Sequence, residues 1–305
     1  MFDTLLGKLE DNSWLTLETS PSKSALFQPL IDRLRALELH TMVDGWSVTD
    51  NPLAKLRYGS IFAAICLQRA FGKPALATVS MRDRNLIGIQ SDLLGSNEFD
   101  IRAFLAVTGD SAALSDQPRA KGVFEANSIA LLNIMSYFNR GIDYAGRLIA
   151  PAPKPIYPFA VTSGNAKNTS ALKRKITQKV AAGAIGVISQ PVFSIEDALL
   201  LQRVFDEATR DLEGDQKKAK LIIGLFPLAR LKTAQFLQAH VPGVRVPDRW
   251  IHALFEANKI SPNDEERVGL EISAELFVSL RRANMPVHIM TANHFEIAKK
   301  IISAV

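Results

Sequence analysis

Cysteine is almost absent from this chain, because Cys66 is the only one among 305 residues. A single thiol excludes an internal disulfide and any metal cluster built from cysteines. The five histidines show no spacing typical of metal ligands, and the zinc-binding pattern H-E-x-x-H does not occur. We therefore expect no metal in the functional site, and we expect Cys66 to pack in the core.

Long hydrophobic runs are also missing. The apolar stretch 61–67 is far too short to cross a bilayer, and the first twelve residues lack the basic and apolar regions of a secretory signal. The sequence thus predicts no membrane partner and favours the cytoplasm. The net charge of +5 is a mild bias that suits an anionic ligand. The densest basic segment, residues 173–179, has no interleaved aromatic residues, so we expect no nucleic-acid partner.

Glycine-rich nucleotide loops are absent too. Neither G-x-G-x-x-G after a strand nor G-x-x-x-x-G-K-[ST] occurs, and the G-x-S-x-G elbow of hydrolases is missing. These absences exclude the simplest dinucleotide, P-loop and serine-hydrolase sites.

What the chain does contain is a regular alternation of short β-rich runs and longer helical patterns. The eight runs span residues 14–18, 46–49, 75–81, 104–107, 157–162, 185–189, 220–226 and 287–291. Because helix follows each run, the pattern predicts a parallel sheet. Eight such units predict closure into a single-domain (β/α)8 TIM barrel over residues 1–305. An open, doubly wound sheet stays the alternative architecture.

Polar residues interrupt the apolar pattern where the predicted strands end. They are Glu18, Thr49, Asp110, Ser163, Gln190 and Asn293. The reactive groups of such a barrel lie at the C-terminal ends of its strands, so we expect these side chains to converge on one rim. Each of them could also be an ordinary cap for the helix that follows.

Glu18 and Asp110 are the two carboxylates in this set. A carboxyl group partly desolvated in the mouth of a barrel is suited to donating a proton, and Glu18 has no basic residue directly after it. The alternative is that Glu18 caps or ion-pairs the first loop. Asp110 follows Gly109, which permits close approach of a ligand. The alternative for Asp110 is an Asx turn.

Four stretches at these strand ends resemble the methylenetetrahydrofolate reductase family, most closely the reductase domains fused to homocysteine methyltransferase domains. They are Leu15-Thr-Leu-Glu-Thr-Ser-Pro21, Met81-Arg-Asp-Arg-Asn85 with its continuation to Gly95, Leu105-Ala-Val-Thr-Gly-Asp110, and residues 179–193. Weaker similarity continues through residues 223–227 and 287–293. The resemblance therefore covers nearly the whole chain.

The resemblance implies a barrel that holds FAD at its C-terminal rim and takes hydride from NADH or NADPH. The flavin then reduces 5,10-methylenetetrahydrofolate, a small-molecule substrate, to 5-methyltetrahydrofolate. By position, Glu18 would be the general acid that protonates N10 of the folate. Asp110 would lie near both the flavin and the pterin, where its fixed charge tunes hydride donation. Gln190 would hydrogen-bond the pterin.

The same carry-over places further residues around FAD. Thr49 would contact the isoalloxazine ring, and Gly109 and Thr78 occupy positions beside it. Lys179 would help to bind the FAD side chain or its phosphates.

The chain departs from the better-known bacterial pattern at several places, and the first motif has Leu17 and Thr19 where that pattern has phenylalanines. Thr78 stands where a histidine is expected near the flavin, Thr108 where an arginine is common, and His294 where the last-strand motif has arginine. Two alternatives to the reductase therefore stay open. One is a flavin- or folate-binding subunit that needs a partner protein for its electrons, and the other is a non-catalytic interaction protein. A homo-oligomer is compatible with each.

Overall fold

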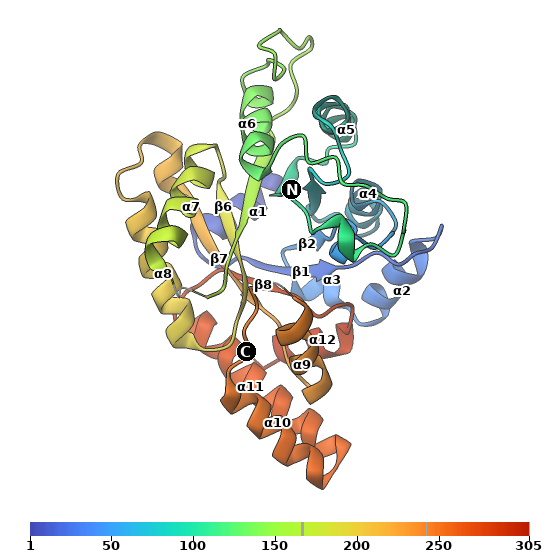
Figure 1. Cartoon of the computed structure of the whole chain (residues 1–305), viewed down its shortest axis with the longest axis vertical. Coiled ribbons are helices and arrows are strands. Elements are labelled where there is room, and N and C mark those ends of the chain that lie inside the picture. The colour runs from blue at the N-terminus through green and yellow to red at the C-terminus, as the bar shows by residue number, and fades with distance from the viewer. Residues whose placement is uncertain (166–167, 242, 305) are drawn as a thin grey trace.

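The strands form one closed, parallel barrel (Figure 1). The computed structural model describes residues 1–165, 168–241 and 243–304. The strands are β1 (Leu15–Thr19), β2 (Gly45–Val48), β3 (Ala75–Ser80), β4 (Ala103–Val107), β5 (Tyr157–Thr162), β6 (Gly186–Val192), β7 (Lys220–Leu225) and β8 (Val287–Ile289). Each strand pairs with the next, and β8 pairs with β1 through Leu15 and Val287. The predicted (β/α)8 barrel is confirmed, and the open sheet is wrong.

Helices surround the barrel and connect its strands (Figure 1). They are α1 (Phe2–Glu10), α2 (Gln28–Ala36), α3 (Leu39–Met42), α4 (Ser60–Phe71), α5 (Leu86–Glu98), α6 (Ser128–Asn139), α7 (Thr169–Ala181), α8 (Ile195–Thr209), α9 (Leu231–His240), α10 (Asp248–Ile260), α11 (Pro262–Arg282) and α12 (Phe295–Ile302). No helix in these described ranges has the length and apolar character that crossing a membrane would require.

The apolar pattern predicts a helix from Leu53 to Phe71, and this start is wrong. Helix α4 begins at Ser60, and Pro52–Ala54 form a short 3-10 turn, η1. Asn51, Leu53 and Ala54 have positive φ angles of 45°, 54° and 57°. A continuous helix cannot include residues in this left-handed region, so the segment is a loop despite its apolar residues.

The strands separate two cores because successive side chains point to opposite faces. Outward residues such as Leu17, Trp46 and Val79 pack against the surrounding helices. Inward residues such as Leu105 and Phe159 fill the barrel itself. Both sets are nearly free of solvent contact, as expected for a parallel sheet covered by helices.

Helix α1, which the periodicity does not predict, closes the N-terminal end of the barrel. Phe2, Leu5 and Leu9 lie on its buried face and belong to the same apolar cluster as the inward strand residues. The ring of Phe2 stacks on Tyr157 of β5 at a centroid distance of 5.4 Å. The lower half of the barrel is therefore a sealed apolar core, and polar chemistry is confined to the opposite end.

We expect Leu5→Ala to lower the free energy of unfolding by about 2–5 kcal/mol, because it leaves a cavity beneath the barrel. Gly7→Ala is the matched control in the same helix. A β-carbon at Gly7 would meet nothing within 4 Å, so helix propensity alone should raise stability by about 0.5–1 kcal/mol. Urea unfolding measures both. Equal, small effects of the two changes would show that α1 is not part of the core.

Candidate functional site at the C-terminal rim

Glu18 points into the upper part of the barrel. Its neighbours Leu17 and Thr19 are buried on the outer side of β1, so alternation turns Glu18 inward. Its side chain is 22% exposed, and its Oε2 lies 3.9 Å from Nε2 of His288 on β8, whose side chain is 2% exposed. The predicted acid thus lies half-buried beside a buried imidazole.

A chain of hydrogen bonds below Glu18 reaches His288 and favours one position for its proton. The Trp14 indole donates from Nε1 to Thr16 Oγ1 over 3.0 Å, and Thr16 Oγ1 lies 2.8 Å from His288 Nδ1. With its oxygen already accepting from Trp14, the Thr16 hydroxyl is free to donate to Nδ1. A neutral imidazole then carries its proton on Nε2, the nitrogen that faces Glu18.

Two other predicted rim residues hold the loop that follows Glu18. Asn293 clamps the backbone of Ser20 from both sides. Its Oδ1 accepts the Ser20 N–H over 2.8 Å, and its Nδ2 donates to the Ser20 carbonyl over 2.6 Å. The hydroxyl of Thr49 donates to Ser20 Oγ over 3.1 Å. These contacts tie the ends of β8 and β2 to the end of β1.

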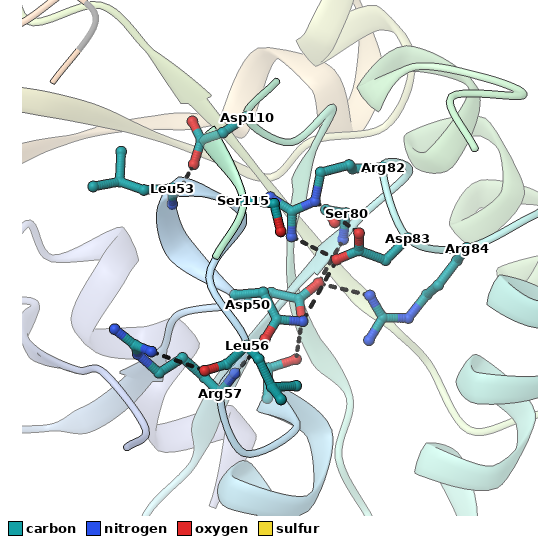
Figure 2. A network of polar contacts seen from close by, with 12 residues as sticks. Asp50, Leu53, Leu56, Arg57, Ser80, Arg82, Asp83, Arg84, Asp110 and Ser115 are labelled. Carbon is teal, nitrogen blue, oxygen red and sulfur yellow. Dashed lines mark hydrogen bonds and ion pairs between the residues drawn. The ribbon is translucent and has the colours of Figure 1, made fainter. Parts of the chain in front are cut away.

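Asp110 lies across the rim from this clamp and contacts the β2–α4 loop. Its Oδ2 accepts the Leu53 N–H over 2.7 Å (Figure 2), within the left-handed segment described above. Gly109 has φ +98°, and a β-carbon there would lie 2.7 Å from the β-carbon of Arg82. Glycine is therefore required at this position, and it brings the end of β4 against the loop after β3.

An ion network that the sequence patterns do not predict lies under Asp110 (Figure 2). Arg84 Nη1 contacts Oδ2 of Asp50, whose side chain is 1% exposed, over 2.6 Å. The same oxygen accepts the Ser80 N–H over 3.1 Å. Arg82 is 3% exposed and donates from Nε to Asp83 Oδ1 over 2.7 Å. This hydrogen bond holds the pKa of Asp83 below its usual value.

The network orders the backbone after β2 and β3, and Gly109 packs closely against its member Arg82. Its members Arg82, Asp83 and Arg84 lie in the motif 81–85 that carries the family resemblance, yet the motif alone gives no role for them. The sequence feature that could have indicated these three residues is the high density of charge directly after a buried strand. Buried charges are stable only when paired, so such a cluster indicates an ordered network.

The remaining predicted residues lie on the other strands. Thr78 faces inward on β3 and is 8% exposed. Gln190 is half-buried on β6, beneath Gly243. Lys179 extends from α7, and its ammonium group donates to the Val161 carbonyl on β5. Burial lowers the pKa of Lys179. Its role toward FAD stays a prediction, as do the roles of Thr78 and Gln190.

Metal ligation has no candidate in the described part of the chain, where no group of three or more His, Cys, Asp or Glu side chains is placed to hold an ion. The candidate site thus comprises a carboxylate–imidazole pair on β1 and β8, an aspartate after β4 and an amide on β6.

Comparison with known proteins gives one family and a set of similar folds. The family described as methylenetetrahydrofolate reductase matches residues 5–305. No curated protein sequence matches the chain.

Solved structures share the fold at low sequence identity. An uncharacterized protein from Clostridium thermocellum that binds two copies of 5-methyl-5,6,7,8-tetrahydrofolic acid has a TM-score of 0.65 at 13% identity, covering 98% of this chain and 97% of that one. An F420-dependent secondary alcohol dehydrogenase has a TM-score of 0.58 at 12% identity, covering 96% and 98%. The EDTA monooxygenase of Chelativorans sp. BNC1 has 0.53 at 10%, covering 95% and 92%.

Because the pKa of Asp83 is lowered by Arg82, folding favours the ionised carboxylate. That stabilisation is present above the unfolded pKa of about 3.9 and is lost as the pH falls through the lower folded value. We expect Asp83→Asn to destabilise the protein at pH 7 and to differ less from the parent below about pH 4. Urea unfolding across this range measures the difference. A difference that does not change with pH would contradict the ion-pair explanation.

Proposed function

The chain belongs to the methylenetetrahydrofolate reductase family, and from that premise we propose that it catalyses the flavin-dependent reduction of 5,10-methylenetetrahydrofolate to 5-methyltetrahydrofolate. The observation that carries the proposal is the half-buried Glu18 beside the buried imidazole of His288. A proton donor at the inner rim of a barrel is what opening of the folate's five-membered ring requires.

The residues present fit a flavin ring. Ser47 Oγ and Ser80 Oγ are buried and have no hydrogen-bond partner within the described ranges. Ser80 lies against Gly109, where an added β-carbon would come within 3.4 Å of its Oγ. Buried hydroxyls without partners are costly, and a planar ring with several polar groups would satisfy them. When bound, the flavin would supply hydride received from NADH or NADPH.

Glu18 performs the acid step in this proposal. It gives its proton to N10 of the folate, the bond from N10 to the bridging carbon breaks, and the carbon stays on N5 as an iminium group that accepts hydride. The carboxylate left on Glu18 faces the Nε2–H of His288, which favours the charged product of the step. His288 thus positions and stabilises Glu18 without touching the substrate.

Asp110 and Gln190 would hold the two ring systems. The Leu53 N–H fixes one oxygen of Asp110, and the other accepts no hydrogen bond from the described residues. We place that oxygen at the flavin and the pterin, with Thr49 and Thr78 beside the flavin. Gln190 would bind the pterin amide, and Lys179 would act toward the outer part of FAD. A preorganised carboxylate costs no reordering when the ligands bind.

We expect Glu18→Gln to keep flavin and folate binding but to slow folate reduction by about 10²–10⁴-fold, the usual contribution of a positioned acid. The protein is reduced anaerobically, mixed with 5,10-methylenetetrahydrofolate and followed by flavin absorbance. Glu10→Gln, at the end of α1 on the opposite face of the barrel, is the control and should react like the parent. Full reduction by Glu18→Gln would remove the acid assignment. Failure of the parent to bind flavin would remove the proposed function.

Thr16→Val removes the hydroxyl that fixes the His288 tautomer while keeping the volume of the side chain. We expect a rate of folate reduction roughly five-fold lower, which corresponds to about 1 kcal/mol for one hydrogen bond. The folate dissociation constant should stay the same, and Thr16→Ser should restore the rate. Equal losses in both variants would assign Thr16 to packing alone.

A further inference from the structure

Helices α4 and α5 lie on the same side of the barrel (Figure 1), and their outward side chains are unusually apolar. Phe62 of α4 is 65% exposed, and Ile87 and Leu94 of α5 are 76% and 44% exposed. Phe99, directly after α5, is 49% exposed. Large apolar side chains that gather on one side of a protein indicate a contact with another molecule.

Side-chain contacts join the C-terminal ends of the two helices. The guanidinium carbon of Arg69 on α4 lies 5.4 Å from the centroid of the Phe99 ring. The neighbouring Gln68 donates from Nε2 to the Asp100 carbonyl over 2.9 Å. The two helices therefore offer their exposed residues as one surface, which we call the α4–α5 face. Its members are Phe62, Arg69, Ile87, Leu94, Glu98 and Phe99.

The α4–α5 face has the dimensions of a protein interface. Helices of 12 and 13 residues are about 18–20 Å long, and two of them side by side are about 20 Å wide. The loop 140–156 enlarges the face, because its Tyr144 N–H donates to Gln90 of α5 over 2.9 Å. Leu148 in this loop is 80% exposed. The enlarged face is of the order of the roughly 800 Å² that each partner buries in a specific complex.

The charges on the two helices are few and complementary. Arg69 is the only charged residue of α4, and α5 contains Asp92 and Glu98. Asp92 pairs with Arg84 over 2.8 Å. Arg69 and Glu98 are exposed, and neither forms an ion pair within the described ranges. The face thus carries one unpaired cation and one unpaired anion among apolar side chains, so its charges match those of a second copy of itself. Interfaces between identical chains are typically this apolar.

A two-fold rotation satisfies both charges. Because α4 and α5 each follow a strand of the same parallel barrel, they run in the same direction. Phe62 and Ile87 lie in the first turns of their helices, and Arg69 and Glu98 lie in the last turns. An axis parallel to the helices and between them would lay α4 of each copy over α5 of the other. Phe62 would then meet the partner's Ile87, and Arg69 would meet the partner's Glu98, twice in each dimer.

We propose that the α4–α5 face is the interface of a homodimer with this two-fold arrangement. The inference does not depend on the proposed function, because the face lies on the outer helices and contains none of the residues assigned to the reaction. Apolar contacts would supply most of the affinity, and the two pairs of Arg69 with Glu98 would fix the relative position of the copies.

Sedimentation equilibrium of the full chain tests the proposal. We expect the parent at micromolar concentration to have twice the monomer mass of 33.5 kDa. Ile87→Glu should raise the dissociation constant of the dimer by about 10²–10⁴-fold, because each dimer loses two buried isoleucines. A carboxylate in the first turn of α5 suits the helix dipole, so the monomer should keep the circular dichroism spectrum of the parent.

Ile260→Glu is the matched control. Ile260 is the last residue of α10, lies outside the α4–α5 face and is 77% exposed, almost the same fraction as Ile87. The control makes the same chemical change at an equally exposed isoleucine, and it should leave the dimer intact.

Exchange of the two charges tests the arrangement of the copies. Arg69→Glu and Glu98→Arg should each raise the dissociation constant roughly ten-fold, because two ion pairs become contacts between like charges. The two changes combined in one chain should restore the parent value, because each pair forms again with its signs reversed.

Two results would overturn the homodimer. One is a parent chain that stays monomeric, and the other is a dimer that Ile87→Glu and Ile260→Glu affect equally. If the combined charge exchange fails to restore a dimer that each single change weakens, the two-fold arrangement is wrong. None of these results bears on the reductase proposal, which is tested by Glu18→Gln.

Discussion

Closure of the sheet between β8 and β1 is the constraint on which the site depends. Leu15 and Leu17 pair with Val287 and Ile289, segments about 270 residues apart in sequence. This pairing places the inward residues of the two strands side by side, so Glu18 meets His288 only because the barrel closes. Without it, the carboxyl group would lie at a free sheet edge, away from the imidazole.

The barrel interior has an apolar half that contributes to stability and, further along its axis, a half that carries the polar side chains. Its lower half is filled by Phe159, Leu105 and the residues of α1, and it excludes water. Its upper half carries Glu18, Thr78 and Gln190 on different strands. An apolar floor under polar groups raises the strength of their electrostatic interactions, because little solvent is present to screen them. Burial of α1 is thus linked to the behaviour of residues that it does not touch.

The strands could be predicted from the sequence alone. Both faces of a parallel barrel strand are buried, so each strand is a continuous apolar run that differs from the periodic pattern of the helices. The sequence also located Glu18, Asp110 and Gln190, because charge or amide at the end of an apolar run is visible without a structure. It did not identify His288, which lies inside a strand between Val287 and Ile289 and has no spacing signature. Its partner is distant in sequence, and pairing across the barrel seam leaves no local pattern.

The start of α4 and the ion network also differ from the sequence-based expectation, because contacts between distant segments determine both. Residues 53–59 continue the helical pattern of the apolar segment that follows, but contacts from Asp110 to Leu53 and from Asn51 Oδ1 to the Arg57 N–H hold them as a loop. These tertiary contacts override local propensity. The Arg82–Asp83 pair could be suspected from charge density, but only the fold shows that Asp50 lies close enough to pair with Arg84.

The rim is held in separate sectors, and this division bears on the substitutions that set the chain apart from the bacterial pattern. Asn293 and Thr49 hold the loop after Glu18 through Ser20, whereas Asp110 is held by the Leu53 N–H, and Asp50 pairs with Arg84. The described residues of neither group use Thr78 or His294 side chains as supports. A change at Thr78 therefore leaves intact the supports that position Glu18 and Asp110. A substitution at either position can thus occur in this barrel without displacement of Glu18.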